Sequence, residues 1–112
     1  TIGSMTSIFG LALGSAYAST KGAVVQLSKS LAIAWAKDNI QVNSILPGWI
    51  ESDMTAKALA DEKFAAAVLP RIPMRRWGTK EDFAGIAVYL MSDASRYHTG
   101  DSFVIDGAYT IF

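Results

Sequence analysis

The chain has 112 residues, of which 51% are hydrophobic, and its ten acidic residues balance its ten basic residues. This length suits one small globular domain, and the neutral charge gives no indication of nucleic acid or an anionic membrane as a partner. Cysteine is absent, which excludes disulfides and makes the cytoplasm the default location. No apolar run reaches the roughly 18 residues that would span a bilayer, so no membrane partner is expected.

A strand and a long helix are predicted in the first third of the chain. Thr1 to Ser4 are typical of the end of a buried strand, and the small residues of 10–15 form a loop in which Ser15 is placed to cap the next helix. That helix is expected over about 16–37, because apolar residues recur three or four positions apart at Val24, Leu27, Leu31 and Ala34. Apolar residues extend round its other side, so it needs a second partner, either another helix of the chain or the same helix of a second subunit.

A second strand is predicted over residues 40–46 and ends at the breaker pair Pro47 and Gly48. A strand, a helix and a strand in that order form a parallel crossover. Ligands of parallel sheets bind beyond the carboxyl ends of the strands, so Ser4, Tyr17 and the Pro47–Gly48 pair are expected to converge at one edge. Asn43 is expected to make structural hydrogen bonds within this strand or an adjoining turn.

Two helices and a last strand are predicted in the remainder. A short amphipathic helix over about 56–69 is followed by prolines that break it. Thr79 and Asp82 are typical of a capping box and start a helix that continues to about residue 91. Residues 102–106 are the last of three expected parallel strands.

Two charged features of this region carry specific expectations. Arg71, Arg75 and Arg76 form a basic cluster that either holds an anionic substrate or partner or is a solvated or salt-bridged surface. His98 is the only histidine, and it has no second ligand or nucleophile at a recognisable spacing. No metal site and no catalytic triad are therefore predicted.

Tyr17 and Lys21 are the strongest candidates for chemistry. A spacing of four places two side chains on the same face of a helix, so a phenol and an ammonium meet. Free tyrosine titrates near about 10, and a cation within about 4–6 Å favours the phenolate. The pair is a candidate general acid/base.

The surrounding motifs extend this pair to a family. Twelve residues separate Ser4 from Tyr17, and three separate Tyr17 from Lys21. The chain continues with Asn43, Pro47-Gly48, Arg76-Trp77-Gly78 and Asp106-Gly107. In this order the motifs resemble those of the short-chain dehydrogenase/reductases, from the first residue to the last. The chain departs from the family at Ala108, where a second glycine is usual.

The resemblance implies an α/β fold, the C-terminal half of a doubly wound parallel-sheet Rossmann-like domain. No stretch matches the phosphate-binding pattern G-x-G-x-x-G. We therefore expect residues 1–112 to be the C-terminal part of a single domain from which the N-terminal cofactor-binding half is absent. The segment over about 51–76 is expected to be a flap over the substrate, and the family favours a homo-oligomer, either a dimer or a homotetramer.

The activity that the resemblance implies is hydride transfer between NAD or NADP and a secondary alcohol or ketone. Tyr17 would exchange a proton with the substrate oxygen, Lys21 would assist Tyr17 and hold the nicotinamide ribose, and Ser4 would hydrogen-bond the same oxygen. The implied cofactor contacts are Tyr17, Lys21, Pro47, Gly48, Ile50 and Ser52. Ser52 stands where the family usually has a threonine that holds the cofactor's carboxamide or phosphates.

Three functions remain open at this point. Residues 34–40 and 71–78 look most like the sugar, polyol and sugar-acid dehydrogenases of the family, such as gluconate 5-dehydrogenase and 2-deoxygluconate 3-dehydrogenase. A 3-oxoacyl-acyl carrier protein reductase is the second enzyme considered. A non-catalytic half-domain that serves as an interaction module is the third, and it applies if the native chain consists of these residues alone.

Overall fold

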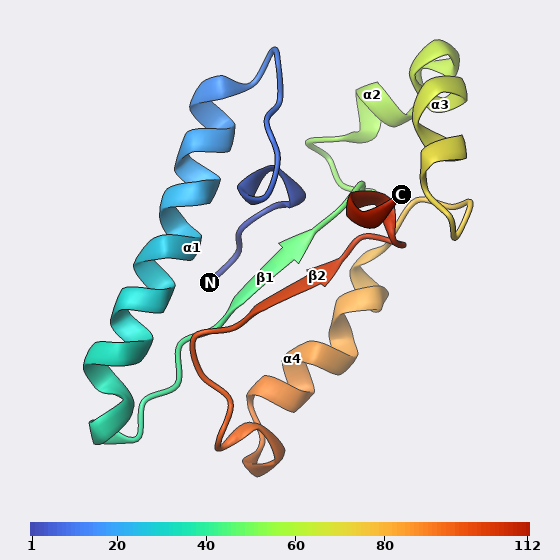
Figure 1. The fold of residues 1–112 in the computed structure, drawn as a ribbon. Coiled ribbons are helices and arrows are strands. Elements are labelled where there is room, and N and C mark those ends of the chain that lie inside the picture. Colours follow the sequence, from blue (N-terminus) through green and yellow to red (C-terminus); the bar gives the residue numbers. More distant parts are fainter.

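A two-stranded parallel sheet lies between two helices in the computed structural model, which describes all 112 residues (Figure 1). Strand β1 (Ser44–Pro47) pairs with strand β2 (Ser102–Ile105), and Ser44 stands opposite Ser102. The predicted α/β fold with a parallel sheet is confirmed. None of the helices combines the length and the apolarity needed to span a lipid bilayer.

The prediction of a third strand at the start of the chain was only partly right. Ile2 forms a single parallel bridge with Ile45, in which the Gly3 N–H donates to the Ile45 carbonyl at 2.8 Å. The chain then turns away at Ser4 into a 3-10 turn over Met5–Ser7, so no further ladder hydrogen bonds form.

Strand β1 begins at Ser44, four residues later than predicted. The backbone just before it bonds to a loop instead of a strand. The Val42 N–H donates to the Thr99 hydroxyl at 3.0 Å, and the Gly100 N–H donates to the Val42 carbonyl at 2.8 Å.

Helix α1 (Ser15–Trp35) covers one face of the sheet and α4 (Ala84–Leu90) covers the other, as Figure 1 shows. Alternate residues of a strand point to opposite faces. Ser44 points to α1, where a hydroxyl cluster joins Ser28 to Thr1 at 2.7 Å and Thr1 to Ser44 at 2.9 Å. The helix was predicted to within two residues at each end. The expected cap was wrong, because Gly14 is the N-cap, Ser15 is the first helical residue, and no side chain caps the turn.

The apolar side chains of α1 are only partly covered by the rest of these 112 residues. Leu27, on the face predicted to be buried, is 55% exposed, and Ile33, on the other side, is 83% exposed. The buried positions of the helix are Ser28 and Ala32. The partner of these exposed side chains, another helix of the chain or the same helix of a second subunit, stays a prediction.

The helix predicted over 56–69 is two helices, α2 (Ala56–Leu59) and α3 (Glu62–Val68). Asp61 separates them, because its carboxylate accepts a hydrogen bond from the Phe64 N–H at 2.8 Å and acts as the N-cap of α3. Asparagine and aspartate favour such caps over helix interiors, since their side chains compete for nearby backbone N–H groups.

A small apolar core, with aromatic side chains packed against it, ties this region to the C-terminus. Four buried apolar residues form it, namely Met5, Val68, Ile72 and Tyr109. Trp49 packs on the edge of Phe64, with ring centroids 5.0 Å apart. The core therefore lies beside the carboxyl end of β1 and anchors α3 there.

The capping box before α4 is also the centre of an ion pair. The Asp82 carboxylate accepts from the Thr79 N–H at 2.8 Å and from both terminal nitrogens of Arg76, at 2.6 and 2.7 Å. The Arg76 hydrogen bonds, and then the Thr79 N–H, hold the pKa of Asp82 well below its usual range.

The other arginines of the basic cluster are also engaged within the chain. Arg71 lies over the Tyr109 ring, 4.8 Å from its centroid, and Arg75 donates to the Pro70 carbonyl at 2.7 Å. The cluster is thus a salt-bridged and stacked surface, as one of the two interpretations predicted.

The Asp82 contact predicts how stability depends on pH. The pKa of Asp82 is lower in the folded chain than in the unfolded chain, so its stabilisation is full above the unfolded value of about 3.9 and is lost as the pH falls below it. We expect Asp82→Asn to lower the Tm at pH 7. The difference in Tm between this variant and the parent protein should shrink as the pH falls towards 2. Asp53→Asn is the control, because Asp53 makes no ion pair. A difference in Tm that stayed constant with pH would contradict this account.

The turn after β2 predicts a stabilising substitution. Gly107 and Ala108 are both left-handed, with φ of 64° and 72°. A Cβ destabilises this conformation, whereas glycine loses more entropy on folding, so Ala108→Gly is expected to raise the free energy of unfolding by about 0.5–1 kcal/mol. The free energy of unfolding is measured by unfolding each protein in denaturant. Ala66→Gly, in the exposed interior of α3, is the control and should lower the same quantity by about 1 kcal/mol. If Ala108→Gly lowered the free energy of unfolding, the claim that the left-handed conformation of Ala108 is strained would be wrong.

Candidate functional site

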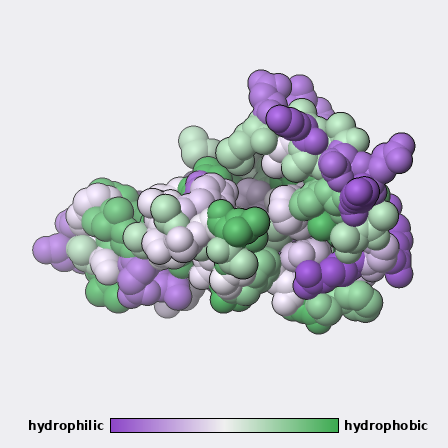
Figure 2. Space-filling view, turned by 90° about the horizontal axis from the view of Figure 1, so that it is seen from above, coloured by the Kyte–Doolittle hydropathy of each residue, from purple (hydrophilic) through white to green (hydrophobic).

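The residues predicted to carry chemistry line one cleft of about 160 Å³ at the carboxyl end of β1. The space-filling view shows the molecule hollowed between the side of α1 and the side of α2 and α3 (Figure 2). Eleven residues from three segments line the cleft: Ile2, Gly3, Ser4, Tyr17, Lys21, Pro47, Gly48, Ile50, Ser52, Met54 and Thr55. All seven residues predicted for catalysis or cofactor contact are among them.

Ser4 is held at the cleft by the turn that follows it. It is 7% exposed, and its Oγ accepts a hydrogen bond from the Thr6 N–H at 3.2 Å. Ser7 accepts from the Ser4 N–H and donates to the Lys21 carbonyl at 2.8 Å, which ties this turn to α1. Because Ser4 Oγ accepts within the chain, its own proton remains available to a ligand.

Tyr17 and Lys21 lie one turn apart on α1, as their spacing predicted. The Lys21 ammonium is 5.6 Å from the centroid of the Tyr17 ring and donates to the Ile2 carbonyl at 3.1 Å. Tyr17 is 38% exposed. The hydroxyls of Ser4 and Tyr17 are not hydrogen-bonded to each other, so both can donate to one oxygen of a bound molecule.

The far wall of the cleft is the backbone after β1. The Gly48 N–H donates to the Ile105 carbonyl at 3.0 Å, and a Cβ on Gly48 would lie 2.5 Å from the Asp106 Cβ. Only glycine allows this approach. Further on, Ile50 bridges Gly78, which fixes the wall against the segment that leads to α4.

Thr55 belongs to the cleft although the sequence-based site did not include it. Its hydroxyl accepts from the Ser52 N–H at 3.0 Å, lies 3.0 Å from Ser52 Oγ and donates to the Ile50 carbonyl at 2.5 Å. Two hydroxyls three positions apart after a strand are a signal for such a turn, because serine and threonine hydroxyls bond nearby backbone groups.

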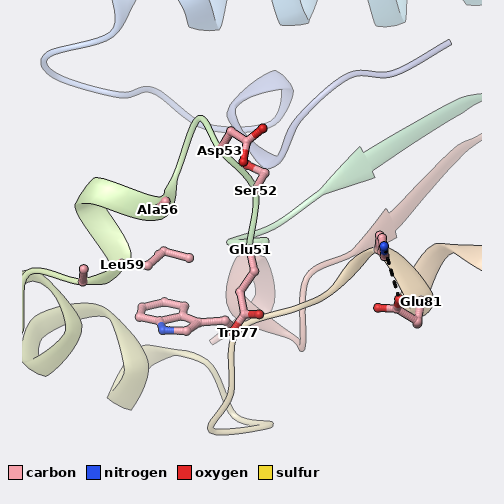
Figure 3. A pocket seen from close by; sticks show the side chains of 9 residues that line it. Glu51, Ser52, Asp53, Ala56, Leu59, Trp77 and Glu81 are labelled. Atoms are coloured by element: carbon pink, nitrogen blue, oxygen red, sulfur yellow. Dashed lines mark ion pairs between the residues drawn. The ribbon is translucent and has the colours of Figure 1, made fainter.

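A larger cavity of about 600 Å³ opens on the other side of Ser52 (Figure 3). Trp77 and Leu59 lie along one side of it, and the exposed pair of Lys80 and Glu81, 4.0 Å apart, lies on the other. It lacks the phenol and the buried hydroxyl of the smaller cleft. We therefore place the candidate site in the smaller cleft, where the groups can act together on one ligand atom.

Asn43 and His98 lie at the opposite end of the strands. The Asn43 side chain donates to the His98 carbonyl at 2.8 Å and accepts from the Asp101 N–H at 3.1 Å, which is the structural role expected of it. The His98 ring joins Asp101 at 2.8 Å to the Tyr89 hydroxyl at 3.0 Å. The His98 hydrogen bond, followed by the Ser102 N–H, lowers the pKa of Asp101.

The chain is similar to a known protein family and to several named relatives. Residues 1–110 match the family model described as enoyl-(acyl carrier protein) reductase. The 2-dehydro-3-deoxy-D-gluconate 5-dehydrogenase of Bacillus subtilis (strain 168) is 44% identical over 96% of this chain and 42% of its own length.

Two solved structures superpose closely on the chain. A gluconate 5-dehydrogenase from Burkholderia cenocepacia J2315, in complex with NADP and tartrate, has a TM-score of 0.95 and 33% identity over 99% of this chain and 44% of its own. A 4-hydroxyisoleucine dehydrogenase complexed with NADH has a TM-score of 0.96 and 32% identity over 100% of this chain and 46% of its own. The chain thus spans less than half the length of these proteins.

Proposed function

Because the chain belongs to the short-chain dehydrogenase/reductase family, we propose that the protein containing it is an NAD(P)-dependent oxidoreductase. It interconverts a secondary alcohol and a ketone. The observation that carries this proposal is the meeting of Ser4, Tyr17 and Lys21 in one cleft with the backbone of 47–55 as its opposite wall.

The residues of the cleft divide the acid/base work. In carbonyl reduction negative charge develops on the substrate oxygen, and donors already aimed at that oxygen stabilise the transition state more than the ground state. Ser4 donates a hydrogen bond to the oxygen while Tyr17 gives it a proton. The Lys21 ammonium, 5.6 Å from the ring, stabilises the phenolate that remains. Alcohol oxidation uses the same groups in reverse.

The cofactor for this reaction is NAD or NADP, whose nicotinamide ring supplies or accepts the hydride. The residues present fit that end of the cofactor. Gly48 keeps the wall free of a side chain, Ser52 offers a hydroxyl, and Lys21 is a cation for ribose hydroxyls. Pro47 and Ile50 complete this wall.

The substrate class that we propose is a sugar acid or a related polyol. The names of relatives support it, since the similar proteins include gluconate 5-dehydrogenases and 2-dehydro-3-deoxy-D-gluconate 5-dehydrogenases. These names favour sugar acids over acyl carrier protein substrates. Residues 51–76 act as the flap over the substrate, and the exposed Met54 on the cleft wall supports this role.

We also propose that the protein is a homo-oligomer, a dimer or a tetramer. The exposed apolar side chains of α1, Ile33 and Leu27, support self-association, because exposed apolar surface can mark interaction sites. The cytoplasm stays a prediction that rests on the absence of cysteine.

A substrate screen tests the proposed function. The protein that contains this chain is assayed with gluconate, keto-gluconates, polyols and simple ketones, each with both cofactors, by the absorbance of the reduced nicotinamide. Turnover of sugar acids supports the proposal. Turnover of 3-oxoacyl thioesters alone would overturn the substrate class, and failure to bind either cofactor would overturn the enzyme assignment.

A further inference from the structure

Two hydrogen bonds make Ser7 a bridge between Ser4 and helix α1. The Ser4 N–H donates to Ser7 Oγ at 3.2 Å, and Ser7 Oγ donates to the Lys21 carbonyl at 2.8 Å. Both directions are fixed, because a backbone N–H can only donate and a carbonyl oxygen can only accept. The hydroxyl of Ser7 thus uses its single proton on the helix and one lone pair on the backbone of Ser4.

The opening segment has few other links to this helix. Three side-chain hydrogen bonds join residues 1–8 to α1, namely those of Thr1 with Ser28, Lys21 with Ile2 and Ser7 with Lys21. Of the three positions in the opening segment, only Ser7 follows Ser4. Ser4 is therefore held on both sides, before it through the Ile2 carbonyl and after it through Ser7, and both of these bonds end on Lys21.

Ser7 itself lies outside the cleft, whereas the residues that it joins line it. Its hydroxyl can therefore influence a ligand only through them. Fixing the backbone of Ser4 against α1 fixes the point from which the Ser4 hydroxyl projects towards the oxygen that it shares with Tyr17. Catalysis depends steeply on such placement, because small displacements of positioned groups lower the rate.

We propose that Ser7 is a positioning residue for the reaction, which holds the Ser4 hydroxyl in register with Tyr17 by joining the turn after Ser4 to the Lys21 carbonyl. This inference rests on the proposed function. Ser7 makes no contact with substrate or cofactor, and its effect on the rate is transmitted by Ser4. The bond from Lys21 Nζ to Ile2 remains when the bridge is removed, so the segment before Ser4 keeps its place.

The test is a double-mutant cycle between Ser7 and Ser4, in which kcat is measured for the parent protein, Ser7→Ala, Ser4→Ala and the double variant. The assay uses a keto-gluconate, or whichever substrate of the screen above the parent turns over, with reduced cofactor. Each kcat is referred to the concentration of sites that bind reduced cofactor in a fluorescence titration. Unfolded protein then does not count as a loss of rate.

Ser7→Ala is expected to lower kcat by about tenfold in the parent background, and by less than about twofold in the Ser4→Ala background. The dissociation constant of the reduced cofactor should change by less than about twofold. A kcat unchanged by Ser7→Ala would overturn the positioning role. An equal fall of kcat in both backgrounds would also overturn the proposal, because Ser7 would then act without Ser4.

Ser95→Ala is the matched control for a purely structural hydroxyl. Ser95 is buried, and its Oγ donates to backbone carbonyls at the end of α4, 3.2 Å from Leu90 and 3.1 Å from Ser92. Its loss should lower the Tm and leave kcat per cofactor-binding site unchanged. The same pattern in Ser7→Ala, a lower Tm with parent kcat, would assign Ser7 to the fold alone and overturn the proposal.

Ser7→Cys covers the case in which Ser7→Ala fails to fold. A thiol has a similar shape but is a weak donor and acceptor, so kcat should fall in the same direction and the fall should again disappear in the Ser4→Ala background. Parent kcat in Ser7→Cys would overturn the proposal. A parent protein that turned over no substrate of the screen would overturn the proposed function itself, which distinguishes the two failures.

Discussion

Tyr17→Phe is expected to lower kcat by about 10²–10⁴-fold and to leave the affinity for the cofactor nearly unchanged. The substitution removes only the phenolic oxygen, so the ring keeps its place on α1 beside Lys21. The substrate oxygen then loses its proton donor, whereas the cleft wall over 47–55 is untouched. Steady-state kinetics and a fluorescence titration with the reduced cofactor measure the two quantities separately.

Tyr97→Phe is the matched control for this experiment. Tyr97 is fully exposed in the loop before β2, and it lies outside the cleft. It should leave both kcat and cofactor affinity at the parent values. Undiminished turnover in Tyr17→Phe would remove Tyr17 from the chemistry.

Lys21→Ala is expected to weaken cofactor binding and to reduce kcat, each by about tenfold or more. A hydrogen bond to a charged group contributes about 1.5–3 kcal/mol, which corresponds to a loss of at least that size. The rate falls as well, because the phenolate of Tyr17 no longer faces a cation. The structure adds a further cause, since the Lys21 ammonium holds the Ile2 carbonyl two residues before Ser4.

Lys37→Ala supplies the control for charge. Lys37 lies in the exposed 3-10 turn after α1, far along the helix from the cleft. It should change neither quantity. If Lys21→Ala affected the rate alone, the proposed contact with the nicotinamide ribose would be wrong.

Long periodic segments of this fold could be predicted from the sequence, and short ones could not. Helix α1 runs for 21 residues, so its apolar spacing of three or four residues recurs over several turns. This recurrence predicts the helix, although it does not fix the exact residues at which the helix begins and ends. The segment 56–69 carried a similar pattern, yet the cap at Asp61 divided it. A local hydrogen bond of this kind competes with helix continuation on nearly equal terms, so pattern alone does not reveal the break.

The opening strand shows the limit set by tertiary contacts. Its residues suit a strand, but the turn at Ser4 leaves only the bridge between Ile2 and Ile45. The start of β1 was misplaced for a related reason, because Val42 bonds to the loop at Thr99. Such pairings join residues far apart in the chain, and no local propensity specifies them.

The residues of the candidate site also differ in how far local sequence patterns predicted them. Tyr17 and Lys21 could be paired from helix geometry, and the rule for parallel sheets predicted that Ser4 would lie near them, whereas Ile50 and Ser52 entered through the family resemblance. Thr55 was missed because it lines the cleft through a turn in which its hydroxyl contacts the Ile50 carbonyl. That contact becomes visible only once the turn is folded.

The most direct test of the proposed chemistry is the fate of the hydride. The protein that contains this chain is supplied with a keto sugar acid and with NADPH or NADH deuterated at C4 of the nicotinamide, and the product is analysed by mass spectrometry and NMR. We predict one deuterium on the carbon that bears the new hydroxyl, and its transfer should be nearly abolished by Tyr17→Phe. Product that carried no deuterium with either cofactor labelled on either face of the ring would contradict hydride transfer by this protein.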